Sequence, residues 1–218
     1  MDKIEVFRDL VLTGPAETRD AVAATLTADA ADPWRFDAEQ SADAGRNAMG
    51  EKGVLLFERS PAAGIPAARL VLWPKDDGYY VPNIVPTSVG QLTTFDYNAV
   101  LADFADTLAR PVARRFGWSV GITSAQQGID DWLAAEPAAA LRRFSAAANK
   151  STGASHPMDE RRWFDFIIAV HRAGGDIGTD RLARWLSEAE GWDEETAHDL
   201  AGEYERGMAL LAREAETR

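Results

Sequence analysis

Hydrophobic and polar residues follow two different rhythms along this chain of 218 residues, and the rhythm changes near residue 124. Before that point, short apolar runs typical of strands are mixed with segments in which apolar residues recur at helical spacing. After it, only the helical spacing remains. The pattern predicts an α+β protein with two domains: an N-terminal mixed sheet of about four or five strands with two helices over residues 1–124, and a C-terminal helical bundle over residues 125–218.

The first half of the N-terminal part is divided by turn residues into short segments. Residues 3–12 suit either a strand or a short helix, residues 16–30 predict a helix, and residues 41–53 predict a polar loop. Residues 54–59 predict a strand, and residues 68–73 and 79–86 predict a hairpin around the turn dipeptide Asp77-Gly78. Because Pro82 and Pro86 cannot donate to a ladder, the second arm of the hairpin is predicted to be an edge strand or bulged.

The remaining elements are mostly helical. A helix over residues 97–116 is predicted to kink or split at Pro111, and residues 118–123 predict a last strand. Four C-terminal helices are predicted, beginning near residues 137, 158 and 179 and after an Asp193 cap. The inner face of the last helix is predicted to consist of Ala197, Leu200, Ala201, Tyr204, Met208 and Leu211.

The charge of the chain narrows the classes of partner. It carries 23 basic and 35 acidic residues, a formal net charge of −12. A field of this sign repels nucleic acid and anionic membranes and attracts a basic protein, so nucleic-acid binding is not expected. Solubility alone would also account for the charge, and both explanations stay open. Heavy use of Ala, Asp and Arg is typical of a GC-rich bacterial genome.

Other absences exclude some chemistry. The chain has no cysteine, which removes disulfides, thiolate metal sites and a cysteine nucleophile. No stretch approaches the roughly 18 apolar residues of a membrane-spanning helix. We therefore expect a cytoplasmic protein without a membrane partner or a cofactor, although lack of cysteine is equally compatible with secretion. His156, His171 and Asp176 match no metal-ligand spacing, so no metal site is predicted.

Residues 149–164 carry an unusual density of basic and hydroxyl side chains for an acidic protein. The stretch lacks the glycines and the preceding strand of a phosphate-binding P-loop. A helical hairpin would still gather its cations, so that a small anion or an acidic patch of a partner binds beside a helix N-terminus. This predicted site, the basic corner, consists of Arg142, Arg143, Lys150, Ser151, Thr152, Ser155, His156, Arg161 and Arg162. The alternative is a solvated structural corner, in which Asp159, Glu160 and Asp165 balance the arginines.

Two histidines are candidates for acid–base chemistry if the basic corner holds a substrate. His156 stands among the hydroxyl residues, and His171 falls within the apolar arc of the helix over residues 158–173. Each has a plainer alternative, since His156 precedes Pro157 and suits a cap or corner. His171 suits a packed side chain bonded to a backbone carbonyl.

The predicted edge strand brings aromatic side chains together. Trp73, Tyr79, Tyr80 and Asn83 form a predicted partner-binding edge, because an exposed strand can accept a strand of a partner and aromatic residues anchor interfaces. The alternative is that these rings pack under the helix over residues 97–116.

Two functions from different classes follow. The first is a non-enzymatic binding protein of the antitoxin, immunity or regulatory type, which meets a basic partner through its acidic surface and its edge strand. The second is an enzyme acting on a phosphorylated or otherwise anionic substrate held by the basic corner, with His156 or His171 as acid or base. The lack of a recognisable catalytic constellation favours the first.

Overall fold

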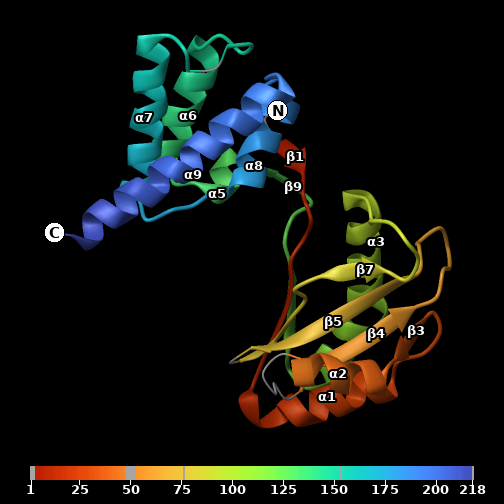
Figure 1. Cartoon of the computed structure of the whole chain (residues 1–218). Coiled ribbons are helices and arrows are strands. Elements are labelled where there is room, and N and C mark those ends of the chain that lie inside the picture. The colour runs from red at the N-terminus through yellow and green to blue at the C-terminus, as the bar shows by residue number, and fades with distance from the viewer. Residues whose placement is uncertain (1–2, 48–52, 76, 153, 218) are drawn as a thin grey trace. The chain divides into compact units, whose positions relative to one another are not determined.

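The computed structural model describes residues 3–47, 53–75, 77–152 and 154–217, and the chain divides into two compact units (Figure 1). Val6–Ala125 form the α+β unit, and Met1–Glu5 together with Gln126–Arg218 form the helical unit. The chain therefore passes from one unit to the other twice, after Glu5 and after Ala125. The predicted α+β fold class, with an N-terminal sheet and a helical C-terminal region, is confirmed.

The α+β unit is built on an antiparallel sheet. Within the described residues it has seven strands, more than the four or five expected, in the order β3-β4-β5-β6-β2-β8 with β7 also paired to β5. The short strand at residues 34–36 is one that the apolar pattern did not predict. The strands are β2 (Leu10–Thr13), β3 (Trp34–Phe36), β4 (Leu55–Arg59), β5 (Ala68–Lys75), β6 (Gly78–Tyr80), β7 (Ile84–Pro86) and β8 (Ser119–Ile122).

The predicted hairpin forms, but its second arm divides into two strands, and only the latter of them, β7, is an edge strand as expected. β6 lies in the interior of the sheet between β5 and β2, with Tyr79 opposite both Pro74 and Leu12. The two prolines do not interrupt it, because Pro82 follows β6 and Pro86 ends β7. Among the described strands β7 pairs only with β5, and β3 and β8 stand at the two ends of the strand order.

The helices of this unit lie against the sheet (Figure 1). α1 (Arg19–Ala28) follows a single 3-10 turn, η1 (Ala16–Thr18), and confirms the helix predicted over residues 16–30. The long helix is split, as Pro111 predicted, into α3 (Thr94–Phe104), a π-helical turn η2 (Ala105–Ala109) and α4 (Arg110–Arg115). Since proline has no N–H to donate, the wider π turn accommodates the break in the hydrogen-bond ladder.

The polar loop predicted over residues 41–53 is wrong for its first part, where α2 (Ala38–Asn47) continues to residue 47; residues 48–52 lie outside the described residues. Asp37 begins the helix by accepting the Gln40 N–H at 3.0 Å. The buried face uses Ser41 and Gly45, and Ser41 accepts the Leu56 N–H of β4 at 2.8 Å. Because this face is made of small residues, the hydrophobic pattern did not indicate a helix.

The helical unit begins with the first residues of the chain. β1 (Lys3–Glu5) pairs antiparallel with β9 (Gln126–Gly128), and Ile4 is only 3% exposed. Arg184 donates to the Glu5 carbonyl at 2.6 Å. The helices are α5 (Ile129–Trp132), α6 (Ala135–Ala147), α7 (Pro157–Arg172), α8 (Thr179–Arg184), the π turn η3 (Trp185–Ala189) and α9 (Glu194–Glu216).

Aromatic rings fill the core of this bundle. Phe144 stacks on Trp192 at 5.3 Å between centroids, and Trp163 lies between Phe144 and Phe166. Tyr204 of α9 stacks on Phe166 at 5.7 Å. Beyond Tyr204 the predicted inner face of α9 is wrong, because Met208 and Leu211 are only partly buried. The end of α9 therefore leaves apolar side chains at the surface.

Candidate functional site

An apolar groove of about 430 Å³ lies between α7 and the second half of α9. The two helices approach closely at Gly207, where an added Cβ would meet the Ile167 side chain at 3.1 Å. We call this the helical groove; its lining residues are Phe164, Ile167, Ile168, Glu203, Arg206, Gly207, Leu210 and Leu211.

The helical groove exposes large apolar side chains. Phe164 is 49% exposed and Leu210 is 71% exposed, one on each wall. Single exposed apolar residues are common on proteins, but several gathered along a groove are typical of an interaction surface. Part of the signal was present in the sequence, since the apolar arc of α7 includes Phe164, Ile167 and Ile168 and is wider than one core-facing stripe requires.

α9 carries a net negative charge, although the groove itself is lined, within the described residues, by one charged residue of each sign, Glu203 and Arg206. It has seven acidic side chains against two arginines, so its side chains carry a net charge of −5 (two minus seven). These are Glu194, Glu195, Asp199, Glu203, Glu205, Glu214 and Glu216 against Arg206 and Arg213.

Three cations of the predicted basic corner bond to other residues of the helical unit. Arg142 donates to both oxygens of Asp130, at 2.8 and 2.5 Å, and this hydrogen bonding holds the pKa of Asp130 below its usual range. Arg162 bonds Asp159 at 2.6 Å. Lys150 donates to the Glu190 carbonyl and lies 3.8 Å from the carboxylate of the same residue.

Lys150 belongs to a partly buried polar network that fixes the turn after η3. Trp192 donates from Nε1 to the Ser145 hydroxyl at 2.8 Å, and Ser145, which is fully buried, donates to Glu190 at 2.7 Å. Glu190 in turn receives Lys150. The lysine, whose side chain is 41% exposed, thus joins this network at its solvent edge.

The other residues of the basic corner face solvent or the turn itself. Ser151 bonds the Asn149 side chain, and the Thr152 N–H donates to the Asn149 carbonyl at 3.1 Å. Arg143, Ser155 and Arg161 are exposed. His156 is the N-cap of α7, where its Nδ1 accepts the Met158 N–H at 3.2 Å, as its plainer alternative predicted.

His171 lies far from His156. The first is in the last turn of α7 and the second is its N-cap, so a rise of about 1.5 Å per residue separates them by roughly 22 Å. His171 lines a different cavity, of about 450 Å³, together with Asp176 and Tyr204. Tyr204 donates to Asp176 at 3.0 Å, and burial raises the pKa of its phenol. The two histidines therefore cannot serve one reaction centre.

The residues of the predicted partner-binding edge divide between core and surface. Tyr79 is 2% exposed and packs against Trp118, so its assignment to a binding surface is wrong. Trp73 and Tyr80 are half-buried, and Asn83 is exposed with its Oδ1 accepting the Ile84 N–H at 2.8 Å. The alternation of side chains along an inner strand separates the two adjacent tyrosines.

The described residues hold neither a cluster of metal-ligating side chains nor a membrane-spanning helix. They contain no group of three or more His, Asp or Glu side chains placed to hold a metal ion. Within the same residues, no helix combines the length and the apolarity that crossing a bilayer requires.

Comparison with known proteins adds one similarity. Residues 137–210 match the model of a domain of unknown function (DUF1889). The matched segment includes α7 and α9 as far as Leu210, and thus both walls of the helical groove. No curated protein and no solved structure matches the chain.

Proposed function

We propose that this protein is a non-catalytic binding protein, of the antitoxin, immunity or regulatory type, that acts in the cytoplasm. Its helical unit takes up an amphipathic helix of a basic protein partner in the helical groove. The observation that carries this proposal is the exposure of Phe164 and Leu210 on facing walls of one apolar groove. Burial of such side chains is the usual source of binding energy when a helix enters a groove.

Charge supports a basic partner over a second copy of the chain. Two copies pairing through this groove would bring together two α9 helices, each with a side-chain charge of −5, the balance of two arginines and seven acids. Like charges at an interface oppose association, whereas lysine and arginine on a partner helix would meet Glu203 in the groove and the net negative charge of α9 as a whole. A basic amphipathic helix suits both the apolar lining of the groove and the net negative charge of α9.

The enzyme alternative has less support. Arg142, Lys150 and Arg162 each contact a carboxylate of the same unit, so an anion would have to compete with Asp130, Glu190 or Asp159. The exposed pair of Arg142 and Asp130 is weak, at about 0–1 kcal/mol. The geometry nevertheless offers no converging set of free cations among these three.

A pair of designed helices tests the proposal. One presents leucines on one face and lysines on the other, and its counterpart replaces every lysine with glutamate. We expect the lysine helix to bind the full chain in calorimetric titration, more weakly as salt rises, and the glutamate helix not to bind. Leu210→Ala and Phe164→Ala should each weaken binding about fivefold to tenfold, as loss of an interface anchor does.

The matched control is Phe95→Ala, since Phe95 is an exposed phenylalanine of the α+β unit at 71% and should not affect the titration. Equal binding of both helices, or no effect of Leu210→Ala, would overturn the proposal. Light scattering measures whether a second copy of the chain occupies the groove. A dimer that Leu210→Ala converts to a monomer would assign the groove to that second copy instead.

A further inference from the structure

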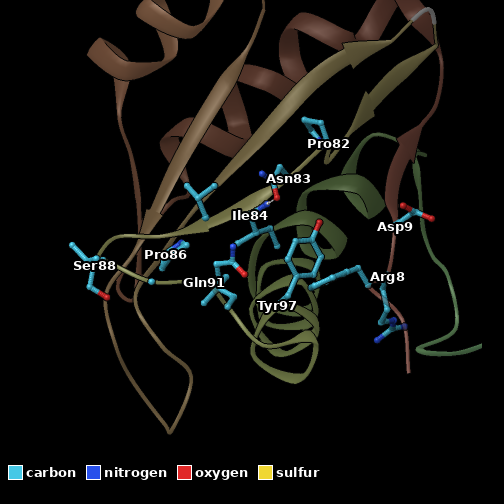
Figure 2. A pocket seen from close by; sticks show the side chains of 14 residues that line it. Arg8, Asp9, Pro82, Asn83, Ile84, Pro86, Ser88, Gln91 and Tyr97 are labelled. Atoms are coloured by element: carbon cyan, nitrogen blue, oxygen red, sulfur yellow. Dashed lines mark hydrogen bonds between the residues drawn. The ribbon is translucent and has the colours of Figure 1, made fainter. Parts of the chain in front are cut away.

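A second groove, of about 650 Å³, lies in the α+β unit where the pairing of β2 with β6 ends (Figure 2). The Val81 N–H donates to the Leu10 carbonyl at 3.0 Å, and this bond continues the ladder just beyond the paired residues. Beyond it, the segment Phe7–Asp9 and strand β7 form two walls, with Tyr97 of α3 at the base. The groove thus occupies a position where the sheet would otherwise continue.

The wall formed by β7 offers acceptors but not donors. The Thr87 N–H donates to the Ala67 carbonyl, just beyond the paired residues of β7 and β5. In an antiparallel pair the N–H and C=O groups of alternate residues point toward the partner strand. Those of Val85 therefore point toward β5, and those of Ile84 and Pro86 point away from it. The Ile84 N–H is taken by Asn83 Oδ1, and Pro86 has no N–H. A partner strand would find carbonyl groups here without the N–H groups that complete a ladder.

The opposite wall is blocked in the same way. The Arg8 N–H donates to Asn98 Oδ1 at 2.9 Å. Asn98 is buried, at 7% exposure, and its Nδ2 donates to the Val6 carbonyl at 2.9 Å, which fixes the side chain in this orientation. On each wall an asparagine side-chain oxygen therefore accepts a backbone N–H group that an added strand would need. Addition of a strand is disfavoured for this reason.

The side chains around the groove also favour a donor-rich ligand. Asp9 brings an exposed carboxylate, and burial together with Asp9 raises the pKa of Tyr97 to about 12, so the phenol stays neutral. Phe7 is 48% exposed and meets the Tyr97 ring edge-on at 4.9 Å. Aromatic rings beside a carboxylate attract cations.

Among the described residues, Arg8 is the cation that lines this groove. Its Nε donates to the Thr123 carbonyl at 2.6 Å, and Figure 2 shows its guanidinium group directed away from the Tyr97 ring. The arginine is thereby held against the β8 side of the segment Phe7–Asp9. The other polar side chains of the lining are those of Asp9, Asn83, Ser88, Gln91 and Tyr97, and among these only Asp9 is charged.

We infer that this groove binds an arginine side chain of an extended basic polypeptide segment. The guanidinium group donates to the Asp9 carboxylate and lies against the Phe7 ring, and other N–H groups of the segment donate to the outward carbonyls of β7 on the far side of Tyr97. This site is in the other unit from the helical groove and does not depend on it. It gives the protein a second place at which a basic partner can bind.

A capped glycine peptide with a single arginine tests the inference, with a citrulline peptide as its neutral counterpart of the same shape. In amide NMR titrations of the full chain, we expect saturable shifts at Phe7, Asp9 and Ile84 with the arginine peptide only. Asp9→Asn should weaken binding roughly threefold, as loss of an exposed ion pair does. Phe7→Ala should weaken it by a similar factor of about three through loss of the cation–π contact.

Glu17→Gln removes an exposed acid of the same unit that does not line the groove, and it should leave the titration unchanged. Equal shifts with the citrulline peptide, or shifts that Asp9→Asn does not weaken, would overturn the inference. Shifts produced instead by inorganic phosphate and lost in Arg8→Gln would do so as well, because they would assign the groove to an anion. Leu210→Ala leaves this titration unaffected, which separates its outcome from that of the helical groove.

Discussion

Arg59 and Asp103 form an ion pair across the core of the α+β unit, with Nε and Oδ2 at 2.8 Å and the arginine only 1% exposed. The same carboxylate oxygen accepts Trp34 Nε1 at 2.8 Å. The guanidinium group also donates to backbone carbonyls of the segment after β4, at Ser60, Ala62 and Ile65. A single buried cation therefore joins β4, α3 and the loop over residues 60–65.

Replacement of Asp103 should be costly. Asp103→Ala leaves the Arg59 charge buried without its partner, so we expect the free energy of unfolding to fall by about 3–5 kcal/mol in denaturant titrations. Asp106→Ala on the following helical turn is the control, because the Asp106–Arg110 pair is exposed and its loss should change stability by less than about 1 kcal/mol. Equal losses of stability in the two variants would show that the buried pair contributes no more to the free energy of unfolding than the exposed pair does.

Ile4 should stabilise the helical unit although it stands at the start of the chain. It is 3% exposed in β1, which pairs with β9, so Ile4→Ala should lower the stability of that unit by about 2–4 kcal/mol. Hydrogen exchange checks this, since amides of α6–α9 should exchange faster while those of β4 and β5 keep their rates. Lys3→Ala, which removes an exposed contact with Asp131, should change exchange little.

The sequence predicted those elements whose apolar residues repeat within one segment. β4, β5, α7 and the Asp193 cap of α9 follow directly from local spacing and capping residues. The pattern of residues 3–12 could not show that β1 and β2 belong to different units, because the partner of β1 lies more than a hundred residues away. Pairing between distant strands depends on the whole fold, so the local spacing of apolar residues does not reveal it.

Candidate sites were less predictable than elements. The sequence shows that residues 142–162 are rich in cations. It does not show that two of these cations pair with Asp130 and Glu190, because both acids come from other segments of the chain. Likewise, Met208 and Leu211 have the spacing of a buried face, yet α9 extends past the helices that would cover it. Spacing shows which side chains share a face and not whether another element reaches that face.

The raised pKa of Tyr97 predicts a pH dependence of stability. The phenol loses its proton at about 12 in the folded protein, against 10.0 ordinarily. Between these values the unfolded chain releases the proton first, so the free energy of unfolding should fall as the pH rises from about 10 to about 12. Denaturant titrations across this range should show a shallower fall in Tyr97→Phe. A tyrosinate absorbance step at the ordinary pH, lost in that variant, would contradict the prediction.

Anions provide the test of the basic corner. If Arg142, Lys150 and Arg162 are held by Asp130, Glu190 and Asp159, phosphate and nucleotides have no vacant cation among these three to stabilise, and added ligand should give no saturable rise in Tm. Lys150→Ala should lower Tm in every buffer alike, because it removes a contact to the turn after η3 rather than a ligand contact. Sulfate distinguishes the two effects, since general salting-out raises Tm without saturation and to the same extent in both proteins. A saturable rise that Lys150→Ala and Arg162→Ala abolish would instead favour an enzyme with an anionic substrate, because only a built site loses its ligand when single cations are removed.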